Sequence, residues 1–367
     1  MIHRLFLLSL FAAPLSAQEE GFTPLFNGKD LTGWVNVNCA AETWTVKDGM
    51  IHCDGVPTGA MRTEKQYENF ILELEWRHLK PGGNAGVFVW AGPISAPGVP
   101  FLRAIEIQVL ENARGEGPSF TTHGDVFPIH GSTMKPFGRH NGQRSFPSEK
   151  RSKPSPEWNH YRITCQDGVL KLAVNGKEVS GGEECNWRKG YIALESEGGI
   201  VDWRNLRIKE LPGGKATAEQ TAPLADGSVS LYNGRDLKGW KASTDPVADW
   251  KASDWELKTT GKGGSLTLDK KPAGNFRLQF DMRAEGKVTD VHAPLRLNGK
   301  EIPVMEVASG SWIRYTVVRD GTVIFCEVNG TKAEKSITSN GTVKDGPLEI
   351  SFQSSTAMSV AGIYLKE

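Results

Sequence analysis

Two polar residues interrupt the apolar pattern of the segment 104–110, and their types could carry chemistry. Side chains alternate between the two faces of a β-strand, so Glu106 and Gln108 share one face while isoleucine and valine occupy the other. A carboxylate accepts hydrogen bonds and an amide both donates and accepts them, which suits the hydroxyl groups of a sugar. The competing interpretation is a solvated strand face with no function.

A second group of candidates lies in the segment Arg114–Pro156, which has little strand pattern and is long for a loop. Loops of this length in a compact domain are usually functional or disordered. Phenylalanines are interleaved with the polar residues, which indicates that the segment packs against the rest of the chain. Its ionisable residues include His123, Asp125, His130, Arg139, His140, Arg144 and Glu149.

Histidine titrates near neutral pH and can act as an acid, a base or a metal ligand. We therefore take His123 and His130 as candidate catalytic residues, and Asp125 and Arg139 as candidate substrate contacts. A purely structural role is the alternative for each histidine. No spacing in the segment forms a known metal signature, so the sequence names no metal ligand there.

The turn Gly82–Gly86 precedes an apolar strand that ends in Trp90. Glycines permit close approach of the backbone to a ligand, to which the Asn84 amide could add a hydrogen bond. Trp90 could stack on a sugar ring. An ordinary hairpin turn and a tryptophan packed in the core would give the same pattern.

The chain contains an internal repeat. The block Leu25–Trp34 recurs 206 positions later as Leu231–Trp240, and Asn69–Arg77 recurs at the same offset. The later block Trp158–Tyr161 recurs only 154 positions later, so the second copy lacks about fifty residues between the blocks. The missing stretch corresponds to the part of the first copy that carries every candidate residue named above, which places any chemistry in the first copy.

Alternating strands and turn dipeptides such as Asn175-Gly176 recur along the chain, and no segment shows a long helical period. Many short strands with frequent turns indicate a β-sandwich or a barrel. We predict a first unit over residues 18–212 and a linker, poor in large apolar side chains, over 213–222. A second, shorter and degenerate unit follows over 223–367.

A basic start, a short apolar run and small residues up to Ala17 predict a secretory signal peptide over residues 1–17. We expect a secreted or periplasmic protein without a membrane span, because no later apolar run is long enough to cross a bilayer. Lys and Arg together number 43, as do Asp and Glu. This balance favours neither nucleic acid nor an anionic membrane as a partner.

An exported chain permits disulfides. The cysteines are Cys39, Cys53, Cys165 and Cys185 in the first copy and Cys326 in the second. One or two bridges are expected in the first copy, with Cys39–Cys53 as a candidate pair, although spacing does not fix the connectivity. Buried free thiols are the alternative.

Several motifs, taken in order, resemble those of the 3-keto-glycoside hydrolase family long called DUF1080, over about residues 21–211. The matching motifs are Leu25–Trp34, Gly83–Phe88, Ile105–Val109, Glu157–Tyr161, Val174–Gly176 and Trp203–Ile208. The resemblance implies a concanavalin A-like jelly roll, so we expect an all-β chain of two tandem jelly-roll sandwiches. It also implies that the substrates are glycosides already oxidised at sugar carbon 3.

For such substrates the resemblance implies hydrolysis by elimination and hydration (a 1,2-lyase step followed by a hydratase step). A ketone at C3 acidifies the C2 proton, a base removes that proton, and the glycosidic group leaves C1. Water then adds to the resulting glucal. Such a site needs a base, an electrophile for the enolate oxygen and an acid for the leaving group.

Glu106 and Gln108 occupy the family's Glu-x-Gln motif, which implies a base or metal ligand and a substrate contact, respectively. The chain also departs from the family pattern. Trp90 stands where many members have arginine, and Glu195 and Glu197 stand where many have glutamine and histidine. The resemblance implies no certain cofactor and leaves a divalent metal ion open.

Two functions compete at this point. The first is an enzyme that cleaves 3-keto-glycosides in the first copy. The second is a non-catalytic carbohydrate-binding protein, because jelly rolls host lectins as well as enzymes. The pair Glu106 and Gln108 favours the enzyme, whereas the altered Glu195 and Glu197 favour the binder; a structural cell-surface module is a weaker third candidate. Deletion of residues 213–367 is expected to leave any chemistry in place.

Overall fold

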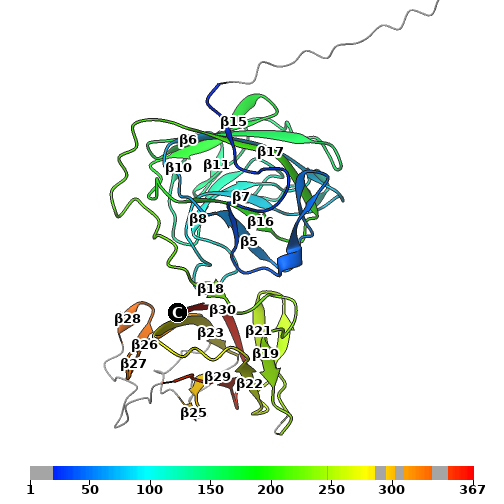
Figure 1. The fold of residues 1–367 in the computed structure, drawn as a ribbon. Coiled ribbons are helices and arrows are strands. Elements are labelled where there is room, and N and C mark those ends of the chain that lie inside the picture. The colour runs from blue at the N-terminus through cyan, green and yellow to red at the C-terminus, as the bar shows by residue number, and fades with distance from the viewer. Residues whose placement is uncertain (1–19, 246, 286–294, 302–309, 333–345) are drawn as a thin grey trace, which may run out of the picture.

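The chain folds into two tandem jelly-roll sandwiches, one above the other in Figure 1. The computed structural model describes residues 20–245, 247–285, 295–301, 310–332 and 346–367, so the predicted signal peptide lies outside it. In this described part the only helical elements are two single 3-10 turns, η1 (Ala41–Thr43) and η2 (Asn112–Arg114). None of the described helices could therefore cross a membrane.

Two antiparallel sheets form the first sandwich, over residues 20–211. Sheet A has nine strands in the order β10 (Lys135–Pro136), β15 (Lys177–Glu183), β14 (Val169–Val174), β13 (Asn159–Gln166), β6 (Phe70–His78), β17 (Val201–Glu210), β4 (Met50–Cys53) and β3 (Trp44–Lys47), with β1 (Thr23–Pro24) beside β17. Sheet B has eight in the order β11 (His140–Asn141), β12 (Arg144–Ser145), β9 (Val126–Ile129), β8 (Ala104–Gln108), β7 (Gly86–Ala91), β16 (Tyr191–Ser196), β5 (Gly59–Thr63) and β2 (Trp34–Asn36).

The core of the first sandwich lies between sheets A and B. Strand β6 turns its alternate residues inward from Phe70 to Trp76, and each is at most 2% exposed. Full burial of a large apolar side chain contributes roughly 1.5–3 kcal/mol. The same alternation in β8 turns its isoleucines into the core and directs Glu106 and Gln108 to the opposite face of sheet B.

The second sandwich is smaller, and the counts here refer to its described residues. Sheet C has eight strands in the order β20 (Lys251–Ser253), β21 (Glu256–Thr259), β30 (Met358–Lys366), β23 (Phe276–Ala284), β26 (Ile313–Asp320), β27 (Val323–Val328) and β28 (Thr331–Lys332), with β18 (Val229–Ser230) beside β30. Sheet D has five in the order β19 (Trp240–Ala242), β22 (Ser265–Leu268), β29 (Ile350–Gln353), β24 (Leu295–Leu297) and β25 (Lys300–Glu301).

The sequence repeat is reproduced in hydrogen bonds of the opening block. Trp34 Nε1 donates to the carbonyl of Leu25 at 2.8 Å, and Trp240 Nε1 donates to the carbonyl of Leu231 at 2.8 Å. In the large sheets, β6 lies between β13 and β17 just as β23 lies between β26 and β30. The two sandwiches are therefore copies of one architecture.

The sandwiches meet at two places. Near β4 and β5, Thr58 N donates to Oδ1 of Asp254 at 2.7 Å, and Arg235 forms an ion pair with Asp54. The second place is the loop 92–103, which joins β7 to β8 and contacts β23, β26 and β30. Two separate contact regions fix the relative orientation of the sandwiches.

The segment 213–222, predicted as a linker, connects the two sandwiches and packs along the first. Arg188 N donates to the carbonyl of Gln220 at 2.7 Å, and Ala216 N donates to a carboxylate oxygen of Glu68 at 2.6 Å. Because the segment has few large side chains, its backbone can pack closely on the surface of the first sandwich. The segment is therefore not a free tether.

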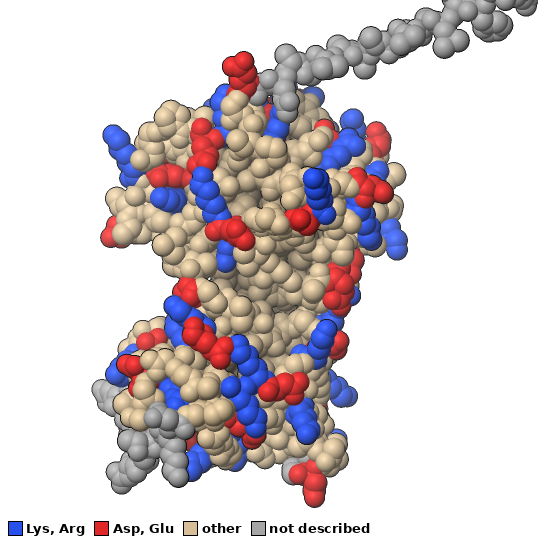
Figure 2. All heavy atoms as spheres, in the orientation of Figure 1, with Lys and Arg blue, Asp and Glu red and all other residues tan. Residues whose placement is uncertain are grey.

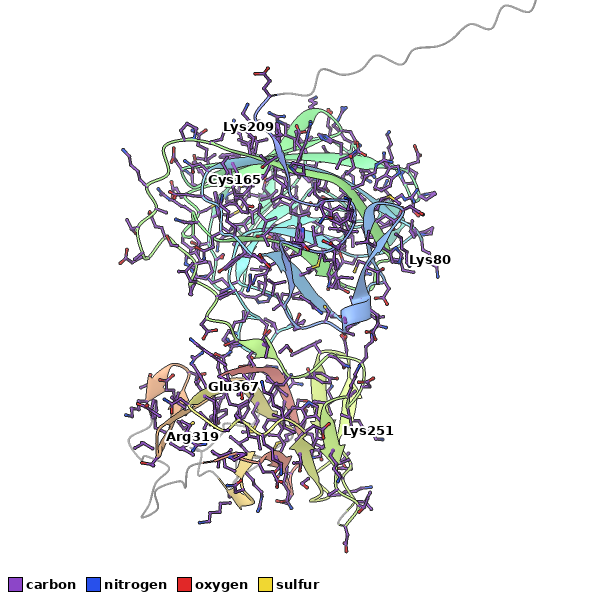
Figure 3. The ribbon with its side chains drawn as sticks, in the orientation of Figure 1. Lys80, Cys165, Lys209, Lys251, Arg319 and Glu367 are labelled. Carbon is purple, nitrogen blue, oxygen red and sulfur yellow. The ribbon has the colours of Figure 1, made fainter. Side chains whose placement is uncertain are left out.

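All five cysteines are buried free thiols, and Figure 3 shows Cys165 within the first sandwich. The expected Cys39–Cys53 bridge is therefore wrong, and the alternative of buried thiols holds. Burial raises the pKa of both the Cys39 and the Cys53 thiol. Each thus acts as a small apolar side chain.

Charged residues of both signs lie intermixed on the face of the molecule that Figure 2 shows. This distribution agrees with the equal totals of 43 basic and 43 acidic residues.

Candidate functional site

The candidate site lies on the face of sheet B that points away from the core, on the adjacent strands β8, β7 and β16. The antiparallel register sets Gly86 of β7 beside Gln108 of β8, and Phe88 beside Glu106. Glu195 of β16 projects to the same face, because Leu194 points into the core while Ala193, two residues before Glu195, packs with Phe88 on the outer face. Three strands therefore bring together residues that are far apart in the sequence.

Gly86 leaves room for two carboxyl groups. A β-carbon at Gly86 would lie 2.9 Å from Oε2 of Glu195 and 3.1 Å from Oε1 of Glu106. These two oxygens can therefore be no more than 6.0 Å apart, the two distances taken together. Glycine is required here by the close approach of two side chains rather than by a backbone angle.

Both carboxyl groups are withdrawn from water. Glu106 is 6% exposed and Glu195 is 1% exposed. Oε2 of Glu195 has no hydrogen-bond partner among the described residues. Burial of an uncompensated carboxylate is costly, so such a group tends to keep its proton.

The pKa values of the three clustered glutamates all rise. Burial raises the pKa of Glu106 to about 8, and the charge of Glu197 adds to the effect. Burial, together with the charge of Glu106, raises the pKa of Glu195 well above its ordinary range. Burial also raises the pKa of Glu197, against the opposing influence of Arg114. At neutral pH the cluster therefore holds at least one proton.

A chain of hydrogen bonds runs beside these carboxyl groups. Arg144 donates from Nε to Oδ2 of Asp125 at 2.7 Å and from Nη2 to Oε1 of Gln108 at 2.6 Å. Gln108 Nε2 in turn donates to Oδ1 of Asn84 at 2.9 Å, and Asn84 Nδ2 donates to Glu197. The chain orients both amides and holds a guanidinium close enough to oppose the rise in the pKa of Glu106.

The cluster reaches the surface at one side. Asn84, Arg144 and Glu197 are half-buried, whereas Glu106 and Glu195 lie beneath them. A ligand would therefore meet the Asn84 amide, the Arg144 guanidinium and the Glu197 carboxyl before the buried carboxyl groups of Glu106 and Glu195.

Four predicted residues come together at this site: Glu106, Gln108, Asn84 and Asp125. The structure adds Glu195 and Glu197, which sequence analysis treated as departures that favoured a binding protein. Period-2 alternation in β16 was the signal for the outward orientation of Glu195. No local pattern could have shown that β16 pairs with β7.

The two predicted histidines lie elsewhere. His123 is buried against Asn112 and Ser152: its Nε2 accepts a hydrogen bond from Ser152 N at 3.1 Å. Burial, reinforced by the charge of Lys150, lowers the pKa of His123 to about 4. His130 is exposed and stacks on Phe101 with ring centroids 6.0 Å apart. Neither histidine has a hydrogen bond to the glutamate cluster.

The prediction that Trp90 stacks on a sugar is wrong. Its side chain is 0% exposed, and its Nε1 donates to the carbonyl of Glu68 at 2.9 Å. Regular alternation would have turned Trp90 outward, but its φ of +50° and a register shift between β7 and β16 turn it into the core. Arg139 likewise lies apart, with its guanidinium 4.8 Å from the ring of Phe146.

No group of three or more His, Cys, Asp or Glu in the described parts of the chain is arranged to hold a metal ion. A metal-ligand role for Glu106, like its role as a base, stays a prediction.

Comparison with known proteins places these observations in a family. Residues 21–209 match the family model described as a 3-keto-alpha-glucoside-1,2-lyase-like domain. A 3-keto-disaccharide hydrolase of Bacteroides thetaiotaomicron is 24% identical over 256 residues, which cover 54% of this chain and 81% of that protein.

Two solved structures resemble the chain more distantly. A candidate glycosyl hydrolase from Parabacteroides distasonis has a TM-score of 0.40 at 22% identity, over 53% of this chain and 95% of that one. The carbohydrate binding module CBM66 from Bacillus subtilis has a TM-score of 0.35 at 12% identity, over 49% of this chain and 96% of that one. Because the family model matches more than half of the residues, the chain belongs to the 3-keto-alpha-glucoside-1,2-lyase-like domain family, and its function is directed at glycosides.

Proposed function

We propose that the first sandwich cleaves glycosides already oxidised at C3, by elimination across C1 and C2 followed by hydration. The observation that carries the proposal is the pair of buried carboxyl groups, Glu106 and Glu195, which face each other across Gly86. Family membership supports the class of substrate. The raised pKa values support proton transfer as the task of the pair.

Glu106 is the base. Because its pKa is about 8, its carboxylate is a stronger base than that of an exposed glutamate. It takes the C2 proton, and the electron pair of the C–H bond forms a double bond between C1 and C2 as the C1–O bond breaks. The C3 ketone carries charge as an enolate oxygen during this step. We assign stabilisation of that charge to Arg144 and to the amide of Gln108, which Arg144 holds in place by a hydrogen bond.

Glu195 is the acid. Burial and the charge of Glu106 raise its pKa well above the ordinary range, which favours the protonated form that can donate to the departing glycosidic oxygen. In the second stage Glu106 gives its proton to C2, while the Glu195 carboxylate takes a proton from a water molecule whose hydroxyl adds to C1. Each carboxyl group thereby returns to its starting form. The sum is hydrolysis that consumes one water and needs no oxidant or reductant.

The direct test is incubation of the purified full chain with a 3-keto-glucoside, with divalent metals supplied, followed by assay of aglycone release and of the glucal intermediate. Glu106→Gln should lower kcat at least about 100-fold, because it removes the base and leaves a similar shape. Glu157→Gln, at an exposed turn, is the matched control and should match the wild type. If Glu106→Gln keeps full turnover, the assignment of the base is wrong.

Glu195→Gln separates the acid from the base. Its kcat should fall sharply for an alkyl aglycone and recover for a nitrophenyl aglycone, which leaves without protonation. Equal losses for both aglycones would contradict an acid role. Saccharide binding without turnover of any 3-keto-glycoside would instead support a non-catalytic carbohydrate-binding protein, which the half-buried Asn84, Arg144 and Glu197 would also suit.

We also propose that the protein is exported, on the basis of the basic and apolar pattern of residues 1–17. N-terminal sequencing of the protein recovered outside the cytoplasm should begin near Gln18. Recovery only from the cytoplasm, with Met1 or Ile2 at the terminus, would contradict export.

A further inference from the structure

The second sandwich covers part of the sheet face that carries Glu106. Beside the glutamates this face is apolar, and its residues are each at most 2% exposed. They are Ala60, Phe88, Ala104, Tyr191 and Ala193. Tyr364 of β30 belongs to the same buried cluster and is 1% exposed. A side chain of the second copy is therefore built into the surface on which the candidate site of the first copy stands.

The loop 92–103 is held between the sandwiches. It begins after β7 and ends before β8, so its two ends continue into the strands that carry Gly86 and Glu106. Ser95 N donates to Oη of Tyr364 at 3.2 Å, and that hydroxyl donates to Oγ of Ser95 at 3.1 Å. The loop is thus tied to the second sandwich by a reciprocal pair of hydrogen bonds.

An ion pair in the second sandwich forms hydrogen bonds with the tip of the same loop. Gly98 N donates to Oδ2 of Asp281 at 2.9 Å. Arg314 binds both oxygens of Asp281, at 2.7 and 2.8 Å, and also donates to the carbonyl of Ser95 at 2.9 Å. Asp281 is 1% exposed, so these bonds are made away from water. Breaking one partner of such a network is costly.

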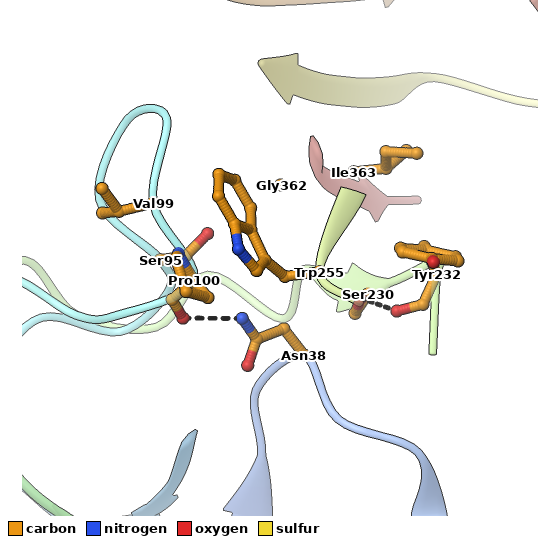
Figure 4. Close-up of a pocket in the computed structure, with 9 residues that line it drawn as sticks. All are labelled: Asn38, Ser95, Val99, Pro100, Ser230, Tyr232, Trp255, Gly362 and Ile363. Carbon is orange, nitrogen blue, oxygen red and sulfur yellow. Dashed lines mark hydrogen bonds between the residues drawn. The ribbon is translucent and has the colours of Figure 1, made fainter. Parts of the chain in front are cut away.

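The loop tip is closely packed against the second sandwich. Gly98 has a φ of +71°, and a β-carbon there would lie 2.4 Å from Cγ of Trp312, which itself packs against Trp255 with ring centroids 5.5 Å apart. From the other side Asn38 Nδ2 donates to the carbonyl of Pro100 at 2.7 Å (Figure 4). The remaining cavity between the loop and the second sandwich is about 10 Å³, the space of about one water molecule.

The surface of the second sandwich that binds the loop has an equivalent in the first sandwich, where it binds no such loop. Asp281 and Arg314 are cross-strand neighbours in sheet C, as Glu75 and His160 are at the equivalent positions of sheet A. In the first copy Glu75 pairs with Arg204 at 2.6 Å, and the same face lines an open groove of about 600 Å³. In the second copy this face is therefore covered by the loop 92–103 of the first copy, whereas in the first copy the equivalent face is open.

We propose that the second sandwich is a positioning element for the candidate site. By holding the loop 92–103 against sheet B, it fixes the ends of β7 and β8 and keeps water from the face that carries Glu106. This inference rests on the proposed function only where turnover is concerned. It replaces the expectation that residues 213–367 are dispensable for the chemistry.

Gly98→Ala in the full chain is the test, with Gly33→Ala as its control. Both glycines have positive φ, +71° and +87°, so both substitutions bear a similar backbone cost. At Gly33 no atom lies within 4 Å of the added carbon, whereas at Gly98 the carbon meets Trp312. The difference between the two variants therefore isolates the contact of the loop with the second sandwich.

Two readouts do not depend on activity. Hydrogen–deuterium exchange of the peptide that spans residues 92–103 should be about tenfold faster in Gly98→Ala, because the amides of Ser95 and Gly98 lose their partners. Gly98→Ala should also admit water to the outer face of sheet B, which brings the pKa of Glu106 closer to that of an exposed glutamate. The free energy of unfolding should then depend less on pH. Gly33→Ala should show neither effect.

With a 3-keto-glycoside, Gly98→Ala should also lower kcat/KM about tenfold. Unchanged exchange in Gly98→Ala overturns the inference, because the loop is then not held by the second sandwich. Faster exchange with unchanged pH dependence and unchanged kcat/KM overturns it as well, because docking then has no effect on the site. If the wild type has no turnover, the proposed function fails while the exchange and titration results still decide this inference.

A second pair of variants covers the case in which Gly98→Ala does not fold. Tyr364→Phe removes only the hydroxyl that bonds Ser95 and keeps the ring in the apolar cluster. Tyr315→Phe is its control, because the buried Tyr315 hydroxyl has no hydrogen-bond partner among the described residues. Faster loop exchange in Tyr364→Phe alone supports the inference, and equal exchange in both variants contradicts it.

Discussion

Replacement of Glu106 by glutamine should make the stability of the protein much less dependent on pH. In the folded protein burial raises the pKa of Glu106 from 4.5 to about 8, whereas the unfolded chain exposes the same carboxyl to water. Between these two values the folded state binds a proton that the unfolded state releases. The contribution is therefore fully present below pH 4.5 and is lost as the pH rises through about 8.

The size of the effect follows from the same two values. One unit of pKa corresponds to about 1.4 kcal/mol, so the shift from 4.5 to about 8 corresponds to about 4–5 kcal/mol. Glu195 and Glu197 share the cluster and its protons, so part of the loss remains when Glu106 alone is replaced. We expect Glu106→Gln to abolish at least about 2 kcal/mol of the loss between pH 5 and pH 9.

Urea unfolding followed by tryptophan fluorescence at pH 5 and pH 9 gives the free energy of unfolding for each variant. Other groups, such as the buried His78 whose pKa is lowered by burial, change stability in the opposite direction. They cancel in the difference between Glu106→Gln and the wild type, because that difference isolates one site. Glu157→Gln should follow the wild type. If Glu106→Gln and the wild type lose equal stability between pH 5 and pH 9, the buried carboxyl does not hold a proton and the assignment of acid and base roles fails.

Four further predictions concern the site. Gly86→Ala should cost about 1–3 kcal/mol of stability and most of kcat, because its β-carbon enters the space between two carboxyl oxygens; thermal melting and turnover measure this, and wild-type values for both would contradict the geometry. Arg144→Lys should lower kcat while the fold persists, since it breaks the fork that joins Asp125 to the amide chain; circular dichroism is the control for folding. The kcat/KM of the wild type should rise about tenfold per pH unit up to about pH 8, as Glu106 ionises, and a flat profile would exclude it as the base. His123→Ala should keep kcat within about threefold of the wild type, because its partners are structural, and a loss as large as that of Glu106→Gln would contradict this assignment.

The parts of the fold that follow from local periodicity could be predicted from sequence. Alternation in the segment 104–110 predicted the face on which Glu106 and Gln108 lie, and the repeat predicted two sandwiches of one architecture. Trp90 shows where that reasoning ends. A single residue at positive φ turns its ring to the other face, and nothing in the types of its neighbours reports the φ.

The remainder of the site depends on strand order, which local patterns do not contain. Glu106 and Glu195 meet because β8 and β16 flank β7, although they are separated by long stretches of chain. The apolar residues beside them on the same face are buried together with Tyr364 of the second sandwich, a contact across distant parts of the chain. Glu195 therefore stands out in the sequence as an unusual residue, but its pairing with Glu106 follows only from the order of the strands.

The docking of the loop 92–103 also bears on the order in which the protein becomes complete. Domains generally fold as units during synthesis, with the N-terminal one first. Tyr364 stands in β30, the last of the described strands, and bonds Ser95 across 269 positions of the chain. The first sandwich can thus form while its loop still lacks an anchor. A chain that stops before residue 358 would keep every glutamate of the site but lack Tyr364 and the strand that pairs with both β21 and β23, so the surface that receives the loop would still be incomplete.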